Sequence, residues 1–393
     1  MSEDKIARAP ERRLRLGFVG GAAPSFIGRV HRIAARYDDQ FEIVAGAFSS
    51  DAKSNRNAAL GLRIAEDRVY ANAEAMVNGE LGRDDRVDLV SILTPNGTHF
   101  AIAKTFTEAG FHVLCEKPVT TTVADALELI RIQRRIGNVF AVAHAYTGYT
   151  MVRHARRLIG EGLLGALRIV QIEYAQGWLS TAVEAAGDKV ARNRTDPVKN
   201  GAAGCLAAIG THAFNLAAYV TGLEATRISA NLRKAVRGRE VPDNAHVLLE
   251  YERGVSGAMW VSQVATGFGN SLGLRIVGER ASLSWSHDEP NRLEIHQSDG
   301  SSTVLTRGGA YVDGPLSAPI GHPEGFTDAF ANLYSGVADL VYASNAGIAP
   351  PIHQFPVPTL LDGAKAVRFA AAALESFANG GAWTDSRLVA QTS

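Results

Sequence analysis

The sequence predicts an α/β protein that begins with a doubly wound parallel sheet and continues into a part built around an antiparallel meander. Up to about residue 145, apolar runs of strand type alternate with segments of helical period. This alternation is typical of βαβ units, in which helices cover both faces of a parallel sheet. After residue 148, strand candidates follow one another at short spacing. The 393 residues suffice for two domains, and we place the boundary near residue 147, giving domains 1–147 and 148–393.

Five strands and four helices are expected in the first domain. The strands are almost continuously apolar, as strands buried on both faces are. Thr98 is the expected N-cap of the third helix, and Gly110 lies just past the end of that helix. The expected strands are 14–20, 41–48, 87–94, 111–117 and 139–145, and the expected helices are 27–37, one that begins near residue 51, 98–109 and 123–136.

The second domain is expected to mix helices with a meander. A strand over 166–178 alternates between apolar and polar residues, which predicts one solvated face. Turn signals such as Ser298-Asp299-Gly300 separate the later strands. The remaining strands are expected at 226–236, 244–252, 255–265, 272–278, 281–286 and 291–297, and helices at 151–160, 201–221, 324–343 and 358–379. The last two helices could pack back on the first domain.

Composition excludes several classes of protein. Lys and Arg total 40, as do Asp and Glu, so the formal net charge is zero, which argues against nucleic acid or a membrane surface as a partner. Two cysteines form neither a disulfide framework nor a zinc pattern, and there is no HExxH motif, so no metal is expected. No apolar run is long enough to span a membrane, and Met1 to Arg15 contains no apolar signal segment. A cytoplasmic location is predicted.

A glycine-rich loop directly follows the first strand. It runs from Gly20 to Gly28 and spans nine positions, whereas the G-x-G-x-x-G fingerprint spans six. Such a loop lets the backbone approach a pyrophosphate, and the N-terminus of the following helix supplies N–H donors. The expected cofactor contacts in this loop are Gly20, Gly21, Ser25, Phe26, Ile27 and Gly28.

The end of the second strand should contact the adenosine ribose. An acid there would bind the 2′-hydroxyl of NAD and repel the 2′-phosphate of NADP. Ser49, Ser50 and Asp51 occupy this tip, with Lys53 and Arg56 just beyond. The hydroxyls and cations favour a 2′-phosphate, whereas Asp51 favours NAD. The pattern leaves NAD(H) and NADP(H) open.

Two further motifs follow strands of the parallel sheet, where ligands bind in doubly wound folds. Thr94-Pro95-Asn96 ends the third strand, and His99 lies three residues later. Glu116-Lys117-Pro118 ends the fourth. A partly desolvated lysine beside an oxidised nicotinamide would have a lowered pKa and could transfer protons. Thr94, Pro95, Asn96, His99, Glu116 and Lys117 are therefore candidate cofactor contacts.

The segments GFVGGAAPSFIG, SILTPNGTH and CEKP, in this order and at these spacings, resemble the Gfo/Idh/MocA family of oxidoreductases. This family includes glucose–fructose oxidoreductase and inositol dehydrogenase. The resemblance covers nearly the whole chain, and CEKP is its most specific motif. It implies an N-terminal Rossmann domain and a C-terminal α/β domain with a large open, mainly antiparallel sheet. It also implies NAD(H) or NADP(H) as cofactor.

The family has a segment G-G-x-x-x-D-I-G-x-H whose Asp and His line the sugar site. The corresponding segment here is 201–212, and it keeps the histidine as His212 but has Ala208 in place of the aspartate. The resemblance implies Lys117 and His212 as catalytic residues. Arg194 could bind a hydroxyl or a carboxylate of the substrate, or pair near Asp196 at the surface. The candidate substrate contacts are Lys117, His144, Tyr146, Trp178, Arg194, Thr211, His212, Asn215 and His322.

The predicted function is oxidation of a secondary alcohol of a sugar, glycoside or inositol to a keto-sugar. His212, with Lys117 nearby, would accept the hydroxyl proton while hydride leaves the same carbon for the nicotinamide. Alternatives are reduction of a C=N or C=C bond, an enzyme that keeps its cofactor bound, and a non-catalytic dinucleotide sensor, which Ala208 favours.

A homodimer or homotetramer is also expected. The segments 247–251, 256–264 and 272–278 would give the open sheet an uncovered apolar face, and such a face needs a partner.

Overall fold

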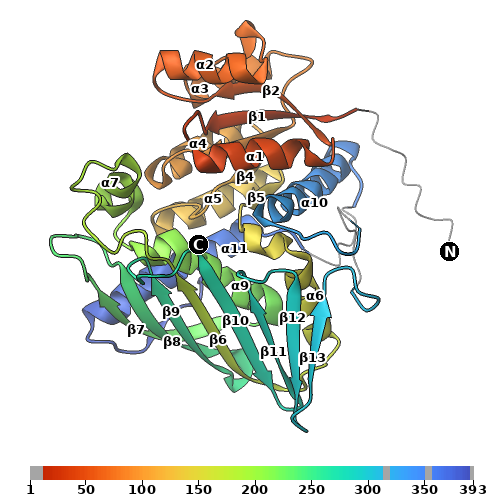
Figure 1. Cartoon of the computed structure of the whole chain (residues 1–393). Helices are drawn as coiled ribbons and strands as arrows, with labels where there is room; N and C mark the ends of the chain where they lie inside the picture. Colours follow the sequence, from red (N-terminus) through yellow and green to blue (C-terminus); the bar gives the residue numbers. More distant parts are fainter. Residues whose placement is uncertain (1–11, 313–318, 350–355, 390–393) are drawn as a thin grey trace.

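The computed structural model describes residues 12–312, 319–349 and 356–389. Residues 1–11, which hold most of the N-terminal segment in which no signal peptide is expected, lie outside this range. The chain forms two sheets, a parallel one of five strands and a mixed one of nine (Figure 1). The predicted fold class is confirmed. No helix among the described residues has the length and apolarity that a membrane crossing requires.

The parallel sheet has the strand order β2-β1-β3-β4-β5, and every neighbouring pair is parallel. Apolar side chains fill both of its faces, and they form two separate core clusters. This explains why these strands have no polar alternation in sequence. The strands are β1 Leu14–Gly20, β2 Phe41–Ala47, β3 Leu89–Leu93, β4 His112–Cys115 and β5 Phe140–Val142, and the helices are α1 Phe26–Tyr37, α2 Ala52–Leu62, α3 Ala73–Leu81, α4 His99–Glu108 and α5 Val123–Ile136.

The larger sheet has the order β13-β12-β11-β10-β6-β9-β8-β7-β14. It is antiparallel except between β6 and β9, which run parallel. The predicted meander is therefore interrupted, because β6 enters the sheet between β9 and β10. The strands are β6 Leu167–Ala175, β7 Ala225–Arg233, β8 Asn244–Tyr251, β9 Ser256–Ser262, β10 Ser271–Gly278, β11 Ala281–Ser286, β12 Arg292–Gln297, β13 Ser302–Thr306 and β14 Thr384–Asp385.

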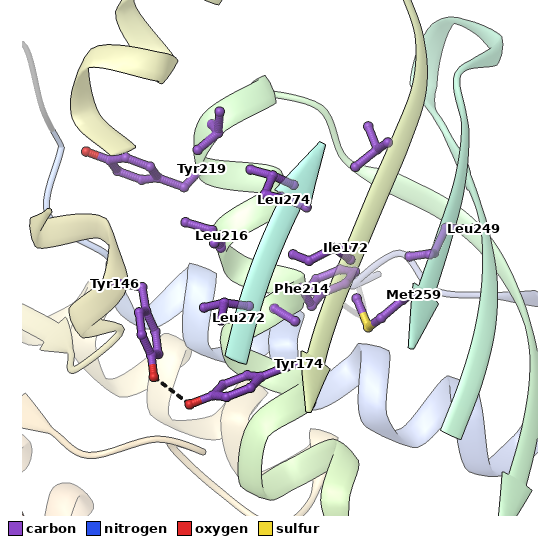
Figure 2. Close-up of a cluster of buried hydrophobic side chains, with 14 of the residues drawn as sticks. Tyr146, Ile172, Tyr174, Phe214, Leu216, Tyr219, Leu249, Met259, Leu272 and Leu274 are labelled. Atoms are coloured by element: carbon purple, nitrogen blue, oxygen red, sulfur yellow. Dashed lines mark hydrogen bonds between the residues drawn. The ribbon is translucent and has the colours of Figure 1, made fainter. Parts of the chain in front are cut away.

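Helices cover one face of this sheet. Its covered face shares a hydrophobic core with the helices behind the strands, and Figure 2 shows Phe214 and Leu216 packed toward Ile172 and Leu272. The helices of this part are α6 Thr150–Gly160, α7 Lys189–Thr195, α8 Pro197–Asn200, α9 Thr211–Thr221, α10 Phe326–Ala346 and α11 Leu360–Ala378. α11 contacts β7 as well as α5 and β5, and α10 lies along α1 (Figure 1). These two late helices thus join the two sheets.

The opposite face of the large sheet is uncovered, but it is not the apolar surface that the sequence predicted. Leu248 and Ile169 are exposed there, yet Gln171, Glu173 and Arg275 line the same hollow of about 1300 Å³. Outward positions alternate with buried ones, and many of them are polar. Assembly through this face stays a prediction.

Several local predictions differ from the structure. Thr98 stands at the N-cap position of α4 as predicted, but its side chain makes no capping bond. Its hydroxyl instead lies 2.7 Å from the Pro95 carbonyl and 2.8 Å from Thr94 Oγ1. β5 ends at Val142, three residues before the end of the predicted strand, and a 3-10 turn, η3 (Ala145–Gly148), begins at the last of these residues. α3 and β13 were not predicted.

Candidate active site

The glycine-rich loop between β1 and α1 has glycines at positions where a residue with a side chain would be strained or would clash. Gly20 and Gly21 have φ values of +85° and +77°, which favour glycine. A Cβ on Gly28 would lie 2.2 Å from the Gly21 carbonyl oxygen. The helix therefore begins in direct backbone contact with the loop, as in dinucleotide-binding turns.

The first turn of α1 offers backbone donors. Ser25 is the N-cap, and its Oγ accepts from Gly28 N at 3.1 Å. No acceptor among the described residues bonds the amide groups of Phe26 and Ile27. Two N–H groups at the positive end of a helix dipole fit a pyrophosphate. The predicted pyrophosphate contacts are thus brought together, and the site fits NAD.

The tip of β2 is exposed and anionic. Asp51 caps α2, with its Oδ1 accepting from Ser54 N at 2.8 Å, and Ser49 Oγ accepts from Asp51 N at 3.2 Å. Hydrogen bonds from Ser54 lower the pKa of Asp51, so the carboxylate is charged at neutral pH. Ser50 is exposed beside it. Asp51 and Ser50 therefore face solvent at the position expected for the ribose, and Ser49 beside them is half-buried.

The loop after β3 is tied to its surroundings through buried groups. His99 is fully buried, and its two ring nitrogens lie 2.8 Å from the Pro118 carbonyl and 2.7 Å from the Thr94 carbonyl. This contact joins the loops after β3 and β4, so His99 has no ring nitrogen left for a cofactor. Asn96 is buried and donates to Asn200 Oδ1 at 2.7 Å, which links this loop to α8.

Glu116 belongs to a chain of buried polar groups in which each member is hydrogen-bonded to the next. Its Oε1 lies 2.9 Å from His31 Nε2, and its Oε2 accepts from the Lys117 amide at 3.1 Å. His31 Nδ1 lies 2.8 Å from the Tyr334 hydroxyl, which lies 2.8 Å from Ser91 Oγ. Burial alone would raise the pKa of Glu116, but the His31 bond and nearby positive charges hold it below its usual value. The carboxylate is thus ionised and held in place from α1, β3 and α10.

Lys117 is buried at the end of β4. Its Nζ donates to the Ala208 carbonyl and, at 3.5 Å, to the Ala207 carbonyl in the π-helical turn η4 (Leu206–Gly210). Burial and, to a smaller extent, the charge of Arg194 lower the pKa of Lys117 to about 7, against the opposing effect of the Glu116 charge. The amine therefore exists in both protonation states near neutral pH.

A group of rings from both domains lies near Lys117. The ring of His212, on α9, lies 5.6 Å from that of His144 and 5.1 Å from that of Tyr146. His144 is 1% exposed, and both of its nitrogens lack a partner among the described residues, as does His212 Nδ1. Burial lowers the pKa of His144 to about 3, and burial and the charge of Lys117 place that of His212 well below its usual value. Both imidazoles are therefore neutral.

Sequence reasoning missed three members of this site. Tyr174, from β6, places its hydroxyl 2.5 Å from that of Tyr146 (Figure 2) and donates to Asn270 Oδ1 at 2.9 Å. Asn270 Nδ2 returns a bond to Tyr146 at 3.1 Å. The ring of His287, just after β11, lies 5.3 Å from that of Tyr146. Tyr174 could have been found as an inward position of an alternating strand, whereas the other two follow only from the sheet order.

Of the remaining predicted substrate residues, two are buried and two are exposed. Thr211 is buried and donates to the Ala207 carbonyl at 3.1 Å, and Asn215 Oδ1 is buried without a partner among the described residues. Trp178 is 39% exposed and donates to Gln176. His322 is exposed in the loop before α10, and no contact brings its ring to the cluster. Among the described residues, no three His, Cys, Asp or Glu side chains gather as a metal site.

Arg194 lies on α7, which Figure 1 shows beside α5 and above the large sheet. Its positive charge lowers the pKa of Lys117 and of His212. The predicted surface pairing near Asp196 is not formed, because Asp196 caps α8 and lies 3.5 Å from Lys199 Nζ.

Comparisons with known proteins agree with this arrangement. Residues 14–144 match the family model for the oxidoreductase family with an NAD-binding Rossmann fold, and residues 152–302 match that for the GFO/IDH/MocA C-terminal domain. An uncharacterized oxidoreductase of Bacillus subtilis is 32% identical over 95% of this chain and 96% of its own length. An inositol dehydrogenase homolog of Azotobacter vinelandii with bound NAD+ superposes with a TM-score of 0.91, at 34% identity, over 95% of this chain and 98% of that one. The same homolog has also been solved with NADH and myo-inositol.

Proposed function

The chain belongs to the GFO/IDH/MocA family of NAD-binding oxidoreductases, and from this we propose that it oxidises a secondary alcohol of a sugar, glycoside or inositol to a ketone. When bound, NAD supplies the carbon that accepts the hydride. We assign cofactor binding to residues 1–147 and most of the substrate site to residues 148–393, with Lys117 and His144 contributed by the first domain. The inositol dehydrogenase homolog supports a polyol, because it was solved with myo-inositol.

The observation that carries the proposal is the environment of Lys117. A neutral amine has two N–H groups and one lone pair, and the carbonyls of Ala207 and Ala208 can take both hydrogens. The lone pair is then left to accept the proton of a substrate hydroxyl. A pKa of about 7 leaves a large neutral fraction at physiological pH, which suits a general base.

His212 has a different role from Lys117 in this proposal. Its pKa is well below the usual value, so the ring is a weak proton acceptor. As a neutral imidazole it can donate one hydrogen bond and accept another. We therefore assign proton transfer to Lys117 and assign orientation of the reacting hydroxyl to His212. The buried and unpartnered His144 supports further contacts with a hydroxylated substrate.

We propose NAD rather than NADP as the preferred cofactor. The charged and exposed Asp51 at the β2 tip supports this, because a carboxylate binds a ribose hydroxyl and repels a 2′-phosphate.

The first experiment titrates the protein with NADH and NADPH by fluorescence and then assays a polyol panel with NAD+ and NADP+. Tighter NADH binding with turnover of a polyol is expected. Binding without turnover of any sugar, glycoside or inositol would contradict the proposed reaction and favour a sensor. Tighter NADPH binding would contradict only the cofactor assignment.

A further inference from the structure

Arg194 is a partly buried cation that has no hydrogen bond or ion pair with any described residue. The buried Arg239 illustrates the usual arrangement, in which a buried guanidinium is paired. Arg239 is buried and donates to both carboxylate oxygens of Glu184, to Asp243 and to the carbonyls of Leu179 and Thr181. A guanidinium has five N–H donors, so Arg239 is fully satisfied. Because charges are rarely withdrawn from water without a partner, the unpartnered Arg194 needs an explanation.

The backbone holds Arg194 at the edge of the candidate active site. Asn200 Nδ2 donates to the Arg194 carbonyl at 3.2 Å, and Asn200 Oδ1 accepts from Asn96 at 2.7 Å. The segment that carries Arg194 is thus fixed to the loop after β3, which holds candidate cofactor contacts. The effect of Arg194 on Lys117 and His212 agrees with this position.

The carboxylates around this segment are already engaged. Asp196 Oδ1 accepts from two amides of α8, and Glu116 accepts from His31 and from the Lys117 amide. Glu184 and Asp243 are held by Arg239. The turn that precedes His212 presents alanines at 207 and 208 and no acid. A partner for Arg194 must therefore come from outside the described chain.

Two neighbouring histidines also have buried ring nitrogens without a partner among the described residues. His144 is 1% exposed with two unpartnered nitrogens, and His212 Nδ1 is buried and unpartnered. Neutral imidazoles can serve the hydroxyls of a polyol, but they do not neutralise a guanidinium. The site thus combines hydroxyl-binding groups with a guanidinium that makes no hydrogen bond or ion pair with a described residue, although the charge of Glu116 acts on it.

We propose that the substrate is a hydroxylated compound with one anionic group, a carboxylate or a phosphate, and that Arg194 binds this group while Lys117 and His212 face the reacting alcohol. Arginine pairs with both anions through two parallel N–H donors. The proposal rests on the function proposed above and narrows its substrate class to sugar acids or sugar phosphates.

The test compares matched substrates with NAD+: glucose, glucuronate and glucose 6-phosphate, then galactose and galacturonate, then myo-inositol and an inositol monophosphate. One acidic member is expected to exceed its neutral counterpart at least about 100-fold in kcat/KM, the discrimination expected of a shielded charge pair. Preference for the carboxylates or for the phosphates identifies the anion. Equal values for acidic and neutral members would overturn the proposal.

The variant Arg194→Met removes the charge, and Arg192→Met is the matched control. Arg192 lies on the same helix, is exposed, and donates to the Gly187 carbonyl at 3.1 Å. Arg194→Met is expected to abolish the preference for the acid mainly through KM, whereas Arg192→Met keeps the preference. An unchanged preference in Arg194→Met would overturn the assignment of Arg194. A tenfold loss of NADH affinity in Arg194→Met would assign Arg194 to the cofactor and also overturn the proposal.

A binding assay separates this inference from the proposed function. The NADH complex is titrated with glucuronate and with glucose 6-phosphate while NADH fluorescence is followed. Saturation that Arg194→Met abolishes, without turnover of any alcohol, would support the anion site and contradict the proposed oxidation. Turnover of neutral polyols without binding or turnover of acids would leave the oxidation intact and overturn the anion site.

Discussion

The two sides of Lys117 differ in how their buried polar groups are satisfied. On the side of the parallel sheet, an unbroken chain of hydrogen bonds joins Glu116, His31, Tyr334 and Ser91. On the side of the large sheet, His144, His212, Asn215 and Arg194 have ring nitrogens, an amide oxygen or a guanidinium that no described residue meets. Folding favours paired buried polar groups, so unpaired ones indicate groups that await a ligand.

This difference indicates separate roles for the two sides. The saturated chain fixes Lys117 at the end of β4, and the unsaturated groups mark the site that we propose for the substrate. The following predictions test that separation, beginning with the largest expected effect.

Lys117→Met should lower kcat for alcohol oxidation by about 10³-fold, because the general base is lost. NADH affinity should stay within about twofold of wild type, since the glycine-rich loop is untouched. The matched control is Lys104→Met, whose lysine is exposed on α4 and pairs with Glu108 at 2.8 Å. Steady-state assays and NADH titration check both variants. A Lys117→Met enzyme with wild-type kcat would remove the lysine from the mechanism.

His31→Phe and His144→Phe should separate the two sides by stability. His31→Phe leaves the Glu116 carboxylate buried without its imidazole partner, an effect of about 3 kcal/mol that should lower Tm by about 5 °C. His144→Phe removes no hydrogen bond and should change Tm by less than about 2 °C, while KM for the substrate rises. Thermal unfolding monitored by circular dichroism checks both. Equal losses of Tm would show that His144 is structural.

Ala208→Asp should change the acidity of Lys117. The Ala208 carbonyl accepts from Lys117 Nζ, so a carboxylate at this residue lies near the amine and stabilises its charged form. The pKa of Lys117 should rise by about one unit, and the pH at which oxidation reaches its plateau should rise equally. A pH–rate profile measures this shift, with Ala208→Asn as the uncharged control. If Ala208→Asp and Ala208→Asn shift the pH–rate profile by the same amount, the carboxylate charge is not the cause of the shift.

Asp51→Ser should alter only cofactor choice. The loss of a charged hydrogen bond to a ribose hydroxyl should reduce the ratio of NAD to NADP affinity about tenfold, which corresponds to about 1.4 kcal/mol. Paired titrations with NADH and NADPH measure the ratio, and kcat with saturating cofactor serves as the internal control. A ratio that does not change would place the ribose away from the β2 tip.

Sequence patterns predicted the parallel sheet closely, because strands buried on both faces are continuously apolar and the helices between them have clear ends. Gly137, for example, ends α5 with a φ of +80° as the helix pattern indicated. α3 was missed because its nine residues include Gly79 and have little apolar periodicity. The insertion of β6 between β9 and β10 is a long-range pairing that no local pattern contains.

Prediction of the site was limited in the same way. Lys117 and His212 could be named as candidates because each lies in a local motif, and the structure brings the segments that carry them together. Tyr174 and Asn270 meet Tyr146 only through the order of the large sheet. Conversely, the position of His322 just before a helix start makes it a candidate substrate contact, but the residue is exposed in the loop before α10.

The most direct test of the account is the pH dependence of kcat/KM for oxidation of the best substrate by wild-type enzyme and NAD+. Because the pKa of Lys117 is lowered to about 7 and the neutral amine is the active form, kcat/KM should rise tenfold per pH unit below about 7 and be constant above it. The reverse reduction, which needs the protonated amine, should fall above about 7. A profile that is flat from pH 6 to 9, or a step that persists in Lys117→Met, would contradict the assignment of Lys117 as the proton acceptor.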